Sequence, residues 1–114
     1  MSYSFPKSAR VRTRNQYQRI AKQSTRHVGS WIIVDVRKNK TEATKMGITA
    51  SKHYGIAVKR NRFKRIVREA FRLCRYQLPT GFDLNIKPRP LAHQANPADI
   101  QKELLSFLLL AQNS

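Results

Sequence analysis

Cysteine and acidic residues are scarce in this 114-residue chain, and each shortage excludes a kind of chemistry. The single cysteine, Cys74, cannot form an internal disulfide, and a zinc site built from several cysteines is also excluded. His27, His53 and His93 are scattered along the sequence, and no two of them form the i,i+4 pair that indicates a helical metal site. The sequence therefore predicts no metal ion held by cysteine or histidine.

The few carboxylates are dispersed as well. Metal-dependent protein nucleases usually hold two metal ions with a cluster of acids, and no such cluster is visible here. The acids of the chain are Asp35, Glu42, Glu69, Asp83, Asp99 and Glu103. We therefore expect no catalytic residue and no cofactor bound by the protein alone.

Long apolar runs are also missing. The longest, residues 107–111, is much shorter than the roughly 18 residues that indicate a membrane-spanning helix. No apolar stretch typical of a secretory signal follows the basic residues near the N-terminus. We therefore expect a cytoplasmic protein with no membrane partner and no obligate protein partner. The length suits a single domain, residues 1–114, in which residues 1–9 are expected to form a flexible arm.

Positive charge is what the chain has in excess. Lys and Arg number 23 against 6 Asp and Glu, which gives a net charge of +17 and a pI near 11.2. Ordinary soluble domains mix both signs on their surfaces. A field of one sign attracts and steers phosphate-bearing partners, so we predict a nucleic-acid partner. An anionic membrane or an acidic protein is the alternative.

A basic amphipathic helix is predicted from about Ala57 to Leu78, where Pro79 and Gly81 would end it. Helical spacing puts the following apolar residues on one face: Phe63, Ile66, Val67, Ala70, Phe71, Cys74 and Leu78. The opposite face carries Lys64, Arg65, Arg68, Arg72 and Arg75. Glu69 can offset only part of this charge, through Arg65 and Arg72, so the face favours an external anion. A merely solvated helix face is the alternative.

Three segments with alternating apolar and polar residues predict strands, namely Trp31 to Val36, Met46 to Ser51 and Phe82 to Lys87. The polar link from Lys38 to Thr44 favours a hairpin between the first two strands. Each strand offers one apolar face and one more polar face.

Two further helices complete the chain. The first is predicted from about Thr13 to Gln23, and its inner residues are Tyr17, Ile20 and Ala21. The last is predicted to begin at Asn96 as N-cap, followed by Pro97 at the first helical position. The order helix-strand-strand-helix-strand-helix predicts an α/β (α+β) two-layer sandwich with a small mixed sheet.

The segment from Met46 to Arg72 closely resembles the signature of the bacterial ribonuclease P protein component, the protein subunit of the ribonucleoprotein that processes tRNA 5′ ends. The family's Gly-Leu-apolar-Ser-Lys-type strand corresponds to Gly-Ile-Thr-Ala-Ser-Lys at residues 47–52. Its helical motif appears here as Arg60-Asn61-x-x-Lys64-Arg65-x-x-Arg68-Glu69. The likeness continues through residues 5–7, Arg10, Val11 and Tyr17, and through the last strand and helix, so it covers nearly the whole chain.

The resemblance implies an endoribonuclease subunit. In that family the RNA subunit hydrolyses the phosphodiester with bound Mg²⁺, whereas the protein binds this RNA and the 5′ leader of precursor tRNA. By resemblance, the residues that bind the RNA subunit are Lys52, Arg60, Asn61, Arg62, Lys64, Arg65, Arg68 and Arg72. Those that bind the leader, in a cleft between the first helix and the polar sheet face, are Arg10, Arg12, Tyr17 and Trp31. The family fold also implies a left-handed crossover around the basic helix, although general rules favour the right-handed form.

Two departures from the family pattern affect the expected leader site. Ala21 occupies the position of a common second aromatic residue, and His53 stands where a further lysine is usual. Leader stacking is therefore weaker than in the family, or shared with Trp31, which strand alternation puts on the polar face. Core roles for Tyr17 and Trp31 are the alternatives.

Two other functions stay open at this point. A structural or ribosomal RNA-binding protein without a role in cleavage would share the charge but not the full helical motif. A DNA-binding module would need a recognition helix with short polar side chains and usually a dimer interface, and neither is visible in the sequence.

Overall fold

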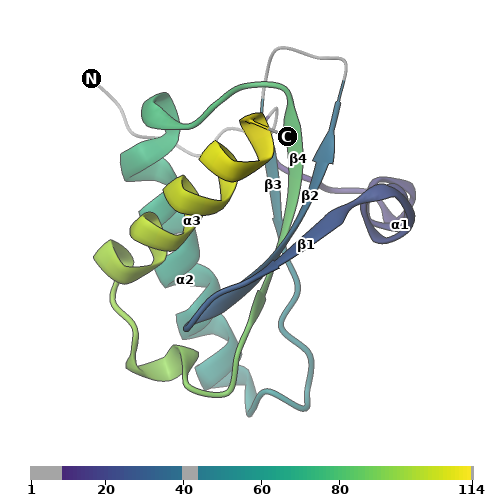
Figure 1. The fold of residues 1–114 in the computed structure, drawn as a ribbon. Coiled ribbons are helices and arrows are strands. Elements are labelled where there is room, and N and C mark those ends of the chain that lie inside the picture. Colours follow the sequence, from purple (N-terminus) through teal and green to yellow (C-terminus); the bar gives the residue numbers. More distant parts are fainter. Residues whose placement is uncertain (1–8, 40–43, 114) are drawn as a thin grey trace.

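The computed structural model describes residues 9–39 and 44–113. Of the predicted N-terminal arm only Ala9 belongs to this part, and residues 40–43 of the predicted polar link lie outside it as well. The main elements are α1 (Arg14–Gln23), β1 (Thr25–Val28), β2 (Ile32–Lys38), β3 (Lys45–Ile48), α2 (Ala57–Cys74), β4 (Phe82–Pro88) and α3 (Pro97–Gln112). Short 3-10 turns lie at Arg75–Gln77 and Ala92–Gln94. The helices α2 and α3 cover one face of the sheet, and α1 lies on the other side (Figure 1).

The sheet has the strand order β1-β2-β4-β3. β1 pairs antiparallel with β2, and β2 pairs antiparallel with β4. β3 pairs parallel with β4, and α2 connects these two strands. The predicted two-layer sandwich with a mixed sheet is therefore confirmed, and α2 forms the crossover between neighbouring parallel strands.

The sheet differs from the predictions in three ways. β1 was not predicted, because its four residues are mostly exposed and polar and show no apolar alternation. The expected hairpin between the strands near residues 31–36 and 46–51 does not exist, since β4 lies between β2 and β3. A polar link indicates only that the chain turns, and it does not specify the strand beside which the chain returns. The strand predicted to reach Ser51 also ends earlier, at Ile48.

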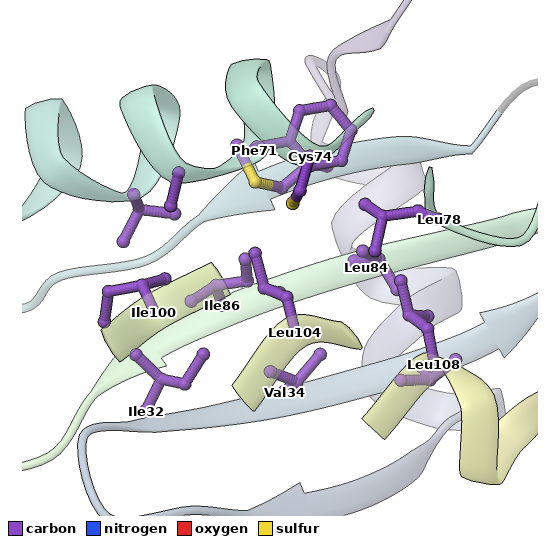
Figure 2. Close-up of a cluster of buried hydrophobic side chains, with 14 of the residues drawn as sticks. Ile32, Val34, Phe71, Cys74, Leu78, Leu84, Ile86, Ile100, Leu104 and Leu108 are labelled. Carbon is purple, nitrogen blue, oxygen red and sulfur yellow. The ribbon is translucent and has the colours of Figure 1, made fainter. Parts of the chain in front are cut away.

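The inner face of the sheet forms one apolar layer with α2 and α3. Figure 2 shows side chains from both central strands meeting those of the two helices. Fully buried members of this layer are Ile32, Val34, Leu84, Ile86, Val67, Phe71, Cys74, Ile100, Leu104 and Leu108. The predicted alternation is therefore confirmed in β2 and β4. Their polar residues Asp35 and Asn85 belong to the outer face, which α1 partly covers.

The helix ends follow the sequence signals where capping side chains are present. Thr13 and Asn96 each form a capping box at the start of α1 and α3. α2 begins after Ile56 without a side-chain cap, and it ends at Cys74 rather than Leu78 because a 3-10 turn follows. Ala21, predicted to face inward, is exposed. None of the helices in the described part of the chain is long and apolar enough to cross a membrane.

The alkylation rate of the Cys74 thiol tests whether this apolar layer is closed to solvent. Burial raises the pKa of its thiol to about 11, so at pH 8 the reactive thiolate is both rare and covered. We predict that iodoacetamide alkylates the native protein at least roughly a hundredfold more slowly than the urea-denatured protein. Mass spectrometry at timed intervals would measure both rates. Rapid alkylation of a protein that keeps its native circular dichroism would contradict the buried position.

Candidate nucleic-acid interface

Helix α2 carries seven of the eight residues predicted to bind an RNA subunit. Among them Asn61, Arg62, Arg65 and Arg68 are exposed, whereas Arg60, Lys64 and Arg72 are half-buried. Lys52 is exposed in the turn that follows β3. All of these side chains except Lys52 therefore come from one rigid helix, which is anchored to the core by its opposite face.

Two of these arginines already have protein partners. Arg72 Nη2 donates to Glu69 at 2.6 Å, so the expected partial neutralisation of the basic face comes from this ion pair. Arg62 Nη1 donates to the carbonyl of His93 at 2.9 Å, which directs this side chain toward the start of α3. Arg65 and Arg68 remain the most outward cations of the central motif.

Tyr17 lies against the outer face of β3, directly over Gly47. A Cβ atom added to Gly47 would stand only 2.6 Å from Tyr17 Oη and 2.7 Å from its Cε1. The close approach of the ring therefore requires glycine at this position. Tyr17 itself is half-buried, so part of its ring remains accessible on the surface of the molecule.

A pocket of about 230 Å³ opens beside this ring. Its charged lining residues are Arg10, Lys64 and Arg68, and no carboxylate lines it within the described residues. The pocket therefore brings together Arg10 and Tyr17, predicted for the leader, with Lys64 and Arg68, predicted for the RNA subunit. An aromatic ring surrounded by cations is the arrangement that binds single-stranded nucleic acid, since bases stack and phosphates pair with the charges.

The segment before α1 is held against the sheet by its backbone. Arg10 forms a parallel bridge with Met46, and the N–H of Val11 donates to the carbonyl of Met46 at 3.0 Å. This pairing places Arg10 at the β3 edge beside α2. Arg12 is exposed, and its N–H donates to Gln16 Oε1 at 2.7 Å at the start of α1.

Trp31 packs against the core cluster, as the alternative interpretation expected. The backbone N–H of Trp31 donates to Glu103 Oε1 at 2.9 Å, and the same carboxylate accepts the backbone N–H groups of Ser30 and Ile32. Asp35 lies in the same cross-strand row as Gly47. Trp31 comes four residues before Asp35, which is about 13 Å along the strand. The structure therefore does not bring Trp31 to the Tyr17 pocket, and a stacking role for it stays a prediction.

The outer sheet face also holds a charged cluster that the sequence did not reveal. Arg26 Nε donates to Asp35 Oδ1 at 2.8 Å, and Lys87 Nζ lies 3.3 Å from Asp35 Oδ2. Burial alone would raise the pKa of Asp35, but the hydrogen bonds from Arg26 and Lys87 outweigh it and hold the pKa below its ordinary value. Asp35 and Lys87 were predicted on polar strand faces, whereas Arg26 belongs to β1, which was not predicted.

No cluster of three or more His, Cys, Asp or Glu able to hold a metal ion occurs among residues 9–39 and 44–113. The interface is therefore one of cations, a tyrosine ring and hydrogen-bond donors. Together with the two-layer fold it defines an α+β domain whose basic surface suits single-stranded nucleic acid.

Comparison with known proteins identifies the family. The Ribonuclease P family model matches residues 5–112, and the chain belongs to this family. The ribonuclease P protein component of Desulforapulum autotrophicum is 36% identical over 103 residues, which cover 90% of this chain and 88% of that protein. The corresponding protein of Thermotoga sp. strain RQ2 is 33% identical over 112 residues, covering 95% and 96%.

Solved structures of the family share the fold. The RNase P protein of Staphylococcus aureus superposes with a TM-score of 0.76 at 28% identity, covering 93% of this chain and 96% of that one. The RNase P protein of Thermotoga maritima gives a TM-score of 0.77 at 30% identity, covering 87% and 94%. The family and the fold that the sequence motif predicted are therefore confirmed.

The contact between Tyr17 and Gly47 can be tested by a double-mutant cycle. We predict that Gly47→Ala lowers the free energy of unfolding by about 1–3 kcal/mol, because the added methyl group overlaps the Tyr17 ring. In a Tyr17→Ala background the same substitution should be neutral or stabilising, since glycine weakens a strand. Urea denaturation would measure all four proteins. An equal loss in both backgrounds would contradict the ring's position over Gly47.

Proposed function

We propose that this protein is the protein subunit of a ribonuclease P ribonucleoprotein, in which an RNA subunit carries out the Mg²⁺-dependent cleavage that matures tRNA 5′ ends. The protein would bind the catalytic RNA through α2 and the 5′ leader of precursor tRNA beside α1. The observation that carries the proposal is the pocket in which Tyr17 meets Arg10, Lys64 and Arg68 in a chain of this family.

The partners of the acidic residues support an RNA-based catalytic centre. Asp35 and Asp83 form ion pairs on the sheet, and Glu69 forms one on α2. Asp99 accepts the backbone N–H of Asn96 in the capping box of α3. Glu103 accepts the backbone N–H groups of Ser30, Trp31 and Ile32. Each acid in the described part of the chain thus has a structural partner, and none lines the Tyr17 pocket. We therefore propose that the Mg²⁺ ions are bound mainly through the RNA subunit.

The position of the pocket suggests how one small domain serves two RNAs. Lys64 and Arg68 line the pocket, whereas Arg65 projects from the same helix outside it. An RNA subunit bound along α2 would therefore lie directly beside a leader bound at Tyr17. In this arrangement the protein holds the leader next to the catalytic RNA, which strengthens precursor binding without any chemical step by the protein.

The assignment is tested by reconstitution. Rigorously RNA-free protein should not cleave precursor tRNA, because residues 9–39 and 44–113 contain no acid cluster that could hold catalytic metal ions. Addition of the ribonuclease P RNA from the same organism should restore Mg²⁺-dependent cleavage at the mature 5′ end, read on denaturing gels. Site-specific, metal-dependent cleavage by the RNA-free protein, or no stimulation of the RNA at moderate salt, would overturn the proposal.

The two binding surfaces can be separated by matched variants. Tyr17→Ala should weaken precursor tRNA binding by roughly 1–3 kcal/mol and leave mature tRNA and RNA-subunit binding nearly unchanged, because only the precursor has a leader. Tyr17→Phe, which keeps the ring, is the control and should be mild. Arg65→Ala should instead weaken RNA-subunit assembly and reduce its salt slope by roughly 0.7–0.9.

Arg68→Ala should affect both measurements, since Arg68 lines the pocket as well as the basic face of α2. Circular dichroism and thermal unfolding check that each variant is folded. Equal losses for precursor and mature tRNA in Tyr17→Ala would show that Tyr17 acts only in the core. Unchanged RNA affinity in folded Arg65→Ala would make that part of α2 a solvated face.

A further inference from the structure

Three charged side chains from three different strands meet on the outer sheet face. Asp35 lies on β2, between Arg26 on β1 and Lys87 on β4. Its carboxylate accepts from Arg26 Nε at 2.8 Å and from Arg26 Nη2 at 3.3 Å, and Lys87 Nζ lies 3.3 Å from Oδ2. One carboxylate thus holds two cations that would otherwise repel each other.

The two cations of the cluster are accessible to a ligand, whereas the carboxylate between them is buried. The Asp35 side chain is only 4% exposed, whereas those of Arg26 and Lys87 are 55% and 33% exposed. Arg26 has five N–H donors and uses two of them on Asp35, and the Lys87 ammonium has three donors. The cluster therefore keeps a net positive charge and presents unused donors to solvent, while its anion is covered.

The cluster lies on the same face of the sheet as the Tyr17 pocket. Asp35, Asn85 and Gly47 form one cross-strand row, so the carboxylate lies two strands from the glycine beneath Tyr17, or about 10 Å away. Lys87 also lines a second hollow, of about 570 Å³, together with Thr49. Thr49 follows Gly47 by two residues and donates to Asn85 Oδ1 at 3.0 Å, so it belongs to the same outer face. The two hollows therefore adjoin in sequence at Ile48, which lines the first, and Thr49, which lines the second.

We propose that Asp35 is a positioning residue that fixes Arg26 and Lys87 as a phosphate-binding pair for the single-stranded leader beyond the Tyr17 pocket. The proposal rests on the proposed function, and it adds Arg26 and Lys87 to the residues that contact the leader. A strand that stacks a base on Tyr17 and runs across the sheet would bring its backbone over these two cations. Charge-assisted hydrogen bonds from both would then hold a phosphate.

Asp35→Asn distinguishes this proposal from an effect of net charge alone, because the two predict opposite changes in the affinity for precursor tRNA. Removal of one negative charge raises the net charge of the protein, which by itself should strengthen binding to any RNA. If Asp35 positions the two cations, the reconstituted holoenzyme should instead bind precursor tRNA about threefold to tenfold more weakly, with mature tRNA binding unchanged. Equilibrium binding at two salt concentrations measures both.

Asp83→Asn is the charge-matched control. Asp83 lies on the same sheet face but pairs with Arg37 at 3.2 Å and Asn39 at 2.8 Å, and it makes no contact with the cluster. This variant should bind precursor tRNA as tightly as the unmodified protein or more tightly. Equal weakening by Asp83→Asn and Asp35→Asn would overturn the proposal, as would a gain of affinity in Asp35→Asn.

Thermal unfolding would reveal whether Asp35→Asn destabilises the domain too much to be tested. In that case the proposal is tested with Arg26→Gln and Lys87→Gln. Each should weaken precursor binding about threefold to tenfold and lower the salt slope by roughly 0.7. Equal loss for mature tRNA would assign the pair to the RNA subunit and overturn the proposal. A leader-specific loss in Tyr17→Ala without any loss in these variants would leave the proposed function intact and remove only this inference.

Discussion

Burial of the inner sheet face beneath α2 and α3 is the interaction on which the rest of the structure depends. Most of the buried large apolar side chains of the described residues enter this single layer, including Phe71, Leu84 and Leu104. The opposite faces of α2 and of the sheet are consequently left to polar residues. One core thus fixes the positions of two polar surfaces, the basic face of α2 and the outer face of the sheet.

The small number of acidic residues determines which basic side chains are held in place. A chain with 23 basic and 6 acidic residues has few anions with which to order its cations. Asp35 and Asp83 hold cations on the outer sheet face, and Glu69 holds Arg72 on α2. The acids therefore orient selected arginines and lysines, while Arg65 and Arg68 stay exposed for a polyanionic partner.

Sequence periodicity predicted those features that depend on neighbours along the chain. The apolar face of α2, the alternation in β2 and β4, and the capping residue Asn96 were all evident, because helical and strand spacing or a local hydrogen bond determines them. The family resemblance added the identity of the helical motif. No local signal specifies which distant strands pair, so β3 was placed beside the wrong strand. β1 was missed for another reason, since its exposed polar residues show no apolar alternation.

The candidate site was predictable to the same extent. Arg10, Tyr17, Lys64 and Arg68 were named from the sequence, but their meeting in one pocket depends on β3 lying at the sheet edge between α1 and α2. The role of Trp31 was ambiguous because strand alternation says nothing about contacts with other elements. In the structure Glu103, on α3, binds the backbone N–H of Trp31. Arg26 could not be named at all, since its importance arises from a carboxylate on the neighbouring strand.

The parallel pairing of β3 with β4 has a consequence for the order in which the surface forms. β1 and β2 are joined by a short turn and can pair early, whereas the whole of α2 separates β3 from β4 in sequence. Contacts between distant segments carry a larger loop-closure cost and form later. The strand that supports Tyr17 is thus expected to pair later than the β1–β2 hairpin. Incompletely folded chains could therefore possess the basic helix before the pocket beside Tyr17 has formed.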